Sequence, residues 1–226
     1  MNNVYSKLRS FGEVLILVSI YFLVPQLVGS LFYYGFKLPE ITSVYIGNIC
    51  VAIIFFFMYK NMLKEKFKEY VSSVNNFGDS LKWWGIGFAI MVVSNLLIYK
   101  FLISDGPVNE ELNRQALLSY PVIGFVSISI IAPFVEEMIF RFGLRKITGN
   151  NIMFPIMSFL IFGFLHTVAG LDRSLLELAY IVPYGALGFV FAKAYQKSDN
   201  IFSSISAHMM HNTFCYVMTI IALGVL

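Results

Sequence analysis

The sequence predicts an all-α fold: a polytopic bundle of about seven transmembrane helices that forms a single integral membrane domain over residues 1–226. Of these residues, 58% are hydrophobic and 13% are charged, whereas a soluble domain carries about 25% charged residues. The mean hydropathy is +0.74. Because such a chain exposes apolar side chains to its solvent, we expect that solvent to be a lipid bilayer, with polar groups pointing into the bundle.

Seven apolar segments approach the ~20 residues that a spanning helix needs. In chain order they are Val14–Phe36, Val44–Tyr59, Trp83–Ile103, Val122–Phe140, Ile152–Gly170, Leu175–Ala194 and Ile201–Leu226. The first is not expected to be a cleavable signal, since it is too long and no small-x-small site follows it. The first three segments and their loops fall in residues 1–120, and residues 121–226 form a second part that carries all the motifs below.

The sequence predicts the local structure of three segments that connect the spans. The lysine-rich stretch Lys60–Lys82 is either a short amphipathic helix on the inner leaflet or a solvated basic linker. The acidic stretch Ser104–Tyr120 is predicted to be an ordinary exterior loop. Between the fourth and fifth spans, residues 148–151 predict a turn in which Gly149 ends a helix.

The distribution of basic residues predicts the orientation. In a seven-span arrangement most lysines and arginines fall on one side, so the positive-inside rule places the N-terminus in the cytoplasm and the C-terminus outside. Short loops suit a bacterial cell membrane. No basic stripe suggests nucleic-acid binding. Cys50 and Cys215 lie in apolar runs and are expected to be small packing residues.

Charged residues near the end of the fourth span are the most informative feature, because each costs roughly 2.5 kcal/mol or more in hydrocarbon. Glu136 and Glu137 are adjacent and point about 100° apart on a helix. Arg141 lies four residues after Glu137, which favours an ion pair and leaves Glu136 as the freer carboxylate. The structural alternative is that both glutamates sit near the interface and pair with nearby basic residues.

Two further polar islands interrupt apolar spans. His166 follows Gly163, which allows another backbone to approach closely; alone, it is more often a packing residue than a ligand. His208 and Asn212 share one face of the last helix, and His211 lies just off that face. Counting about 1.5 Å per residue brings these islands level with Glu136. We therefore expect one chamber within the membrane, near its cytoplasmic side.

Glu-Glu-x-x-x-Arg at 136–141, Phe-x-x-x-His at 162–166 and His-x-x-x-Asn at 208–212 resemble the three motifs of the CPBP or Abi family. This family includes CAAX prenyl endopeptidases and bacteriocin-processing or immunity membrane proteins. The order and spacing match over roughly Val122–Met218. The resemblance implies a polytopic intramembrane endopeptidase that hydrolyses a membrane-associated or lipidated peptide.

The resemblance also implies roles for the polar residues. Glu136 with His166 would activate a water molecule. His208 and Asn212 would stabilise the oxyanion or hold a metal, with Glu137 and Arg141 in support. Glu136, His166 and His208 could hold Zn²⁺ with an open position for water, as the family name metalloprotease suggests. The same residues could equally work without metal, as a carboxylate base with an oxyanion hole.

Two other classes of function stay open at this stage. The first is a non-proteolytic membrane protein of the same fold, acting in bacteriocin self-immunity or in regulation of signalling partners. The four intact polar groups count against it, because a scaffold does not need them. The second is a transporter or proton-linked channel with Glu136 and the histidines as a relay, which predicts polar residues spread through the bilayer.

Overall fold

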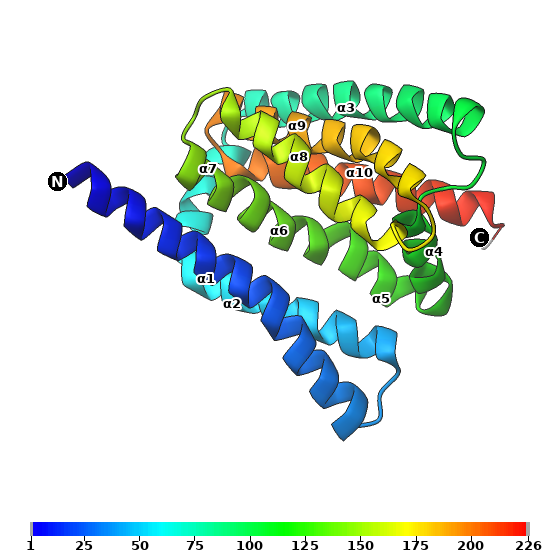
Figure 1. The fold of residues 1–226 in the computed structure, drawn as a ribbon. Helices are drawn as coiled ribbons and strands as arrows, with labels where there is room; N and C mark the ends of the chain where they lie inside the picture. Colours follow the sequence, from blue (N-terminus) through cyan, green and yellow to red (C-terminus); the bar gives the residue numbers. More distant parts are fainter. Residues whose placement is uncertain (1, 225–226) are drawn as a thin grey trace.

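The computed structural model describes residues 2–224, with side chains from Tyr5 onward, and contains no strand in that range (Figure 1). The all-α prediction is confirmed. The helices are α1 (Asn2–Ser30), α2 (Glu40–Val71), α3 (Val74–Phe101), α4 (Val108–Ser119), α5 (Pro121–Val126), α6 (Ala132–Glu137), α7 (Leu144–Thr148), α8 (Met153–Thr167), α9 (Ile181–Ser198) and α10 (Ile201–Ala222).

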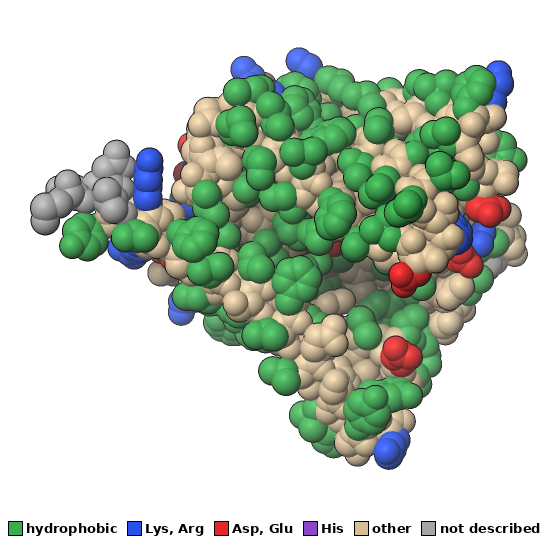
Figure 2. All heavy atoms as spheres, in the orientation of Figure 1, with side chains coloured by type: hydrophobic (Ala, Val, Ile, Leu, Met, Phe, Trp, Pro, Cys, Tyr) green, Lys and Arg blue, Asp and Glu red, His purple; other side chains and the backbone are tan. Residues whose placement is uncertain are grey.

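Six helical stretches of the described chain are long and apolar enough to cross a membrane, close to the predicted count of about seven. They are Tyr5–Gly35, Glu40–Val71, Val74–Phe101, Pro121–Thr148, Met153–Gly170 and Leu175–Ser198. The seventh predicted segment forms α10, which is a continuous helix but is not among those six. Apolar side chains cover much of the face in Figure 2, which is hollowed near its centre, as expected for a protein that packs its outer surface against lipid.

The basic stretch Lys60–Lys82 is not a solvated linker, because its first part is a helical segment that follows a kink in α2. α2 runs for 32 residues to Val71 but is kinked at Tyr59, where the backbone angles are φ −119° and ψ 16°, and α3 begins three residues after Val71 at Val74. At about 1.5 Å per residue, the part of α2 before this kink is roughly 28 Å long, close to the ~30 Å thickness of the hydrocarbon core. The lysines therefore sit on helical turns that extend beyond the apolar part of α2.

The helix pairs that hold the site pack closely. The hairpin α8–α9 is tight because Gly163 faces the start of α9: a Cβ on Gly163 would lie 2.8 Å from the carbonyl oxygen of Ile181. The predicted close approach at Gly163 is thus present. The predicted turn before α8 is also present, since α7 ends at Thr148 and Gly149 adopts a φ of 74°. Both α9 and α10 pack against α3.

The fourth span is one long helix from Pro121 to Thr148, interrupted by two π-helical turns, Ser127–Ile131 and Met138–Gly143. Proline causes the first interruption, because Pro133 has no N–H to donate and its ring crowds the preceding turn. The N–H of Ala132 accordingly donates to Ser127, five residues back. Glu136 and Glu137 lie on the short α-helical stretch between the two turns, where π-turns often mark functional sites.

The prediction of an ordinary loop over Ser104–Tyr120 is wrong. This segment forms α4, which starts after Pro107 and carries Glu110 and Glu111 in its first turn. The preceding residues are fixed to the α8–α9 connection, since the hydroxyl of Tyr180 donates to the carbonyl of Asp105 at 2.5 Å. This helix lies at the end of the bundle away from the N-terminus (Figure 1).

Candidate active site

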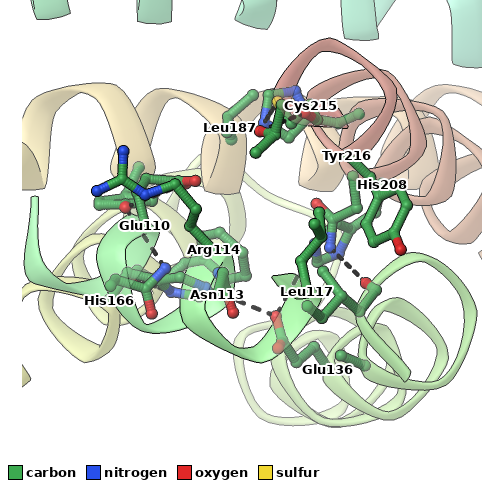
Figure 3. A pocket seen from close by; sticks show the side chains of 18 residues that line it. Glu110, Asn113, Arg114, Leu117, Glu136, His166, Leu187, His208, Cys215 and Tyr216 are labelled. Carbon is green, nitrogen blue, oxygen red and sulfur yellow. Dashed lines mark hydrogen bonds and ion pairs between the residues drawn. The ribbon is translucent and has the colours of Figure 1, made fainter. Parts of the chain in front are cut away.

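Polar residues from the three motif-bearing spans line one cavity of about 150 Å³ inside the bundle, hereafter the chamber (Figure 3). This volume accommodates a peptide group and a water molecule, which occupies about 30 Å³, but not a folded segment. The residues that line the chamber come from α4, the fourth span and α8 to α10: Asn109, Glu110, Asn113, Arg114, Leu117, Ile128, Ala132, Glu136, Phe162, His166, Tyr184, Leu187, His208, His211, Asn212, Cys215, Tyr216 and Thr219.

Glu136 presents its carboxylate to two imidazoles. Its Oε2 atom lies 3.8 Å from Nε2 of His166 and 3.9 Å from Nε2 of His208. These distances exceed those of hydrogen bonds. Oε2 is also buried and has no hydrogen-bond partner among the described residues. A buried carboxylate oxygen that is not satisfied by the protein is available to a reactant in the chamber.

The other ring nitrogen of each histidine has a hydrogen-bond acceptor of its own. Nδ1 of His166 lies 2.9 Å from the carbonyl oxygen of Phe162, and Nδ1 of His208 lies 2.8 Å from Oε1 of Glu137. Because both partners can only accept, each Nδ1 carries the proton. In the neutral rings, Nε2 therefore faces Glu136 as an acceptor.

Glu137 and Arg141 form the predicted ion pair, and both side chains are fully buried. Nη1 of Arg141 lies 2.9 Å from Oε1 of Glu137, and the hydroxyl of Ser204 donates to the second carboxylate oxygen. The guanidinium also lies over the ring of Phe162 at 4.4 Å and that of Phe191 at 5.3 Å. The pair is thus buried inside the bundle next to His208, whose Nδ1 atom contacts the same carboxylate.

Asn212 is tied to the π-turn of the fourth span. Its amide nitrogen donates to the carbonyl oxygen of Ile128 at 2.8 Å. That oxygen has lost its usual helical donors, because the N–H of Ala132 bonds to Ser127 and Pro133 has no N–H. A side chain from α10 thus satisfies a backbone acceptor that the proline-induced turn leaves free, and one amide hydrogen of Asn212 remains for the chamber.

Several of the residues that line the chamber were not assigned to the site from the sequence. His211, interpreted as lying off the motif face, and Cys215, interpreted as packing, both line the chamber, with Nε2 of His211 3.6 Å from Sγ of Cys215. The ring centroid of Tyr184 lies 5.1 Å from that of His166. The α4 residues were missed because this segment was predicted to be a loop. Pro107 and two glutamates in the first turn are helix-start signals that could have identified it.

Glu110 of α4 contacts the same tyrosine. The hydroxyl of Tyr184 lies 3.4 Å from Oε1 of Glu110 and 3.4 Å from Nδ2 of Asn109. Part of the Glu110 side chain is exposed, but its carboxyl group is closely surrounded. The resulting desolvation raises the pKa of Glu110 above its usual range, and the hydrogen bond from Tyr184 offsets this in part.

The chamber reaches the end of the bundle that carries α4, opposite the N-terminus. If the N-terminus is cytoplasmic, as the basic residues predict, this end faces outward. A cytoplasmic N-terminus is therefore incompatible with a chamber near the cytoplasmic side, because the chamber reaches the end of the bundle that carries α4. Both stay predictions, and they can be tested separately.

Glu136, His166 and His208 are the residues that the sequence predicts as Zn²⁺ ligands. Zn²⁺ requires about four ligands at roughly 2.0–2.2 Å for nitrogen and oxygen. Between Tyr5 and Gly224, no group of three His, Cys, Asp or Glu side chains is placed to hold a metal ion. The contacts that exist are pairwise, from Glu136 to each histidine. This arrangement does not match a metal centre, and the Zn²⁺ site stays a prediction.

The sequence is similar to those of several known proteins. The chain is 28% identical over 181 residues to the "Putative membrane peptidase YdiL" of Bacillus subtilis (strain 168), covering 76% of this chain and 69% of that protein. It is 24% identical over 142 residues to the UPF0177 protein YvdC of Lactococcus lactis, covering 60% of this chain and 52% of the relative.

A third relative, an uncharacterized protein of Mycoplasma capricolum, is 30% identical over 192 residues, which cover 76% of this chain and 53% of that protein. The chain thus spans about half the length of the second and third relatives. No solved structure gives a significant match. Residues 118–214 match the model of the family described as type II CAAX prenyl endopeptidase Rce1-like. The matched part of the chain carries all three polar motifs and is thus similar to the Rce1-like family of CAAX prenyl endopeptidases.

Proposed function

We propose that this protein is an intramembrane endopeptidase that hydrolyses a membrane-associated peptide, with Glu136 as the general base. One observation carries the proposal: the buried Oε2 of Glu136 has no hydrogen-bond partner among the described residues and faces two imidazoles in the chamber. A transporter relay would spread its polar residues along the bilayer, whereas these residues gather at one place. The family match supports the peptidase class.

The first step places a water molecule beside Glu136. The carboxylate takes one proton from this water molecule while the oxygen atom of the water attacks the carbonyl carbon of the scissile peptide bond. His166 assists, since its Nε2 atom faces the same carboxylate and its Nδ1 atom is fixed on Phe162. The products of the step are a protonated Glu136 and a tetrahedral intermediate with a negatively charged oxygen.

The second step needs stabilisation of that oxyanion and a proton for the leaving amine. The remaining amide hydrogen of Asn212 is one donor. His208 is the other when protonated, since its Nδ1 atom is held by the Glu137 carboxylate and its Nε2 atom faces Glu136. Glu136 then returns its proton to the leaving nitrogen as the C–N bond breaks, which releases a free amine and a carboxylic acid. Preorganised donors of this kind contribute about 10²–10³-fold each in other hydrolases.

The test compares membrane-associated peptides extracted from cells that produce the wild-type protein, Glu136→Gln, or His166→Ala. We expect a precursor to accumulate with both variants, and its cleaved product to appear with wild type alone. Glu40→Gln is the matched control, because this carboxylate lies in the first turn of α2 and does not line the chamber. Normal processing by a Glu136→Gln protein inserted at wild-type level would refute the general-base role.

A further inference from the structure

A second hollow adjoins the chamber at the end of the bundle that carries α4. This hollow, hereafter the vestibule, has a volume of about 800 Å³ and is much larger than the chamber. Glu110, Arg114 and Thr219 line both spaces. The vestibule can hold several residues of an extended peptide, whereas the chamber holds little more than one peptide group.

Arg114 is the cation at the boundary between the two spaces. Of the two arginines at the chamber and its support, Arg141 is fully buried and bound to Glu137. Arg114, by contrast, has no ion-pair or hydrogen-bond partner within residues 5–224, and its side chain is exposed. In Figure 3 it reaches from α4 along the same side of the chamber as Glu110.

The neighbouring acidic residues, Glu110 and Glu111, contact other side chains than Arg114. Glu110, one helical turn before Arg114, faces the hydroxyl of Tyr184 instead. Glu111 lies 3.8 Å from Arg173, whose guanidinium also binds the buried Glu177. The vestibule thus contains one arginine that is already paired and one that is available. A guanidinium has a planar fork of donors that matches a carboxylate.

We propose that Arg114 binds a carboxylate of the substrate peptide and thereby determines which peptides enter the chamber. The carboxylate is either the C-terminal group of the peptide or the side chain of an aspartate or glutamate, because the same contacts serve both. The inference rests on the proposed function in that the ligand is a peptide, but Arg114 touches the substrate away from the scissile bond.

The test measures binding and not cleavage, so its outcome is independent of the catalytic roles. Three apolar hexapeptides carry the same N-terminal fluorophore: one has a free C-terminus, one a C-terminal amide, and one an amide together with a single aspartate. Their dissociation constants are measured by fluorescence anisotropy with the full-length protein in detergent, in the Glu136→Gln background so that the probes stay intact.

We expect at least one of the two carboxylate-bearing peptides to bind about tenfold more tightly than the plain amide. Whichever does so identifies the source of the carboxylate. Adding Arg114→Gln should abolish that preference, and Arg114→Lys should retain part of it. Lys100→Gln is the control, since it removes a positive charge at the end of α3 without lining either space.

Three results would overturn the inference: equal binding of all three peptides, absence of saturable binding, or a preference that survives Arg114→Gln. Equal weakening of all three peptides by Arg114→Gln would instead indicate a structural role or a lipid headgroup as ligand, and would also reject it. Loss of precursor processing in Glu136→Gln cells together with any of these results would leave the peptidase proposal standing.

Discussion

Nδ1 of His208 and Oε1 of Glu137 lie 2.8 Å apart, although 71 residues separate them in the chain. The same carboxylate oxygen lies 2.9 Å from Arg141. Glu137 therefore connects the motif of the fourth span to the motif of α10. It fixes the imidazole so that Nε2 faces Glu136, and it balances the charge of a buried guanidinium.

We expect Glu137→Ala to reduce folded yield as well as activity. The substitution leaves Arg141 buried without its carboxylate, and breaking a buried pair in this way costs about 3–5 kcal/mol. Thermal unfolding in detergent, followed by tryptophan fluorescence, measures the loss. The double variant Glu137→Gln with Arg141→Met should unfold at a higher temperature than Glu137→Gln alone, because no unpaired charge remains. A stable but inactive Glu137→Ala protein would argue that Glu137 takes part directly in the chemistry.

The bond from Asn212 to Ile128 gives a second prediction. Asn212→Ala leaves the carbonyl of Ile128 without a donor, which we expect to destabilise the protein by about 1–3 kcal/mol. Pro133→Ala supplies an N–H five residues after Ile128, the spacing at which a π-turn donates, so Asn212→Ala should cost less in that background. A double-mutant cycle on the free energy of unfolding measures the coupling. Equal costs in both backgrounds would show that the proline-induced turn does not create the need for Asn212.

These two bonds show where the sequence is informative and where it is not. The spacing of Glu137 and Arg141 predicts their ion pair because it is a local property of a helix. Residue counting along the spans also brings Glu136, His166 and His208 to a common level, and their contacts lie within 4 Å.

The bond between His208 and Glu137 could not be predicted in this way. It depends on how α10 is rotated against the fourth span, and that rotation follows from packing. Pro133 could have indicated the first π-turn, but a proline alone does not say whether a helix bends, ends or gains a residue. α4 was missed for a different reason: its polar composition resembles a loop, although its helix-start signals are ordinary.

The role of metal can be decided directly. The proposed glutamate mechanism needs no metal, and no group of three His, Cys, Asp or Glu side chains among the described residues is placed to hold one. We therefore expect purified protein to keep its activity on the identified precursor after dialysis against a chelator, and elemental analysis to find less than one zinc per chain. Loss of activity on chelation, followed by its recovery on addition of Zn²⁺ alone, would establish the predicted zinc and reassign Glu136 and the two histidines.

The orientation of the chain decides from which side the vestibule is reached. Lysines near the end of α2, together with Arg145 and Lys146 on α7, lie at the end of the bundle that carries the N-terminus. The positive-inside rule assigns that end to the cytoplasm, so α4 and the vestibule should face outward. We expect a membrane-impermeant maleimide to label Gln115→Cys on α4 in intact cells.

The matched probe for the opposite end is Lys7→Cys, which should be labelled only after the cells are permeabilised. Cys50 and Cys215 are first replaced by alanine, so that the introduced thiol is the reactive one. The reverse labelling pattern would place the N-terminus outside and the vestibule on the cytoplasmic side, where the chamber was first expected. Since Arg114 lies at the vestibule, the same experiment tells which compartment delivers the substrate's carboxylate.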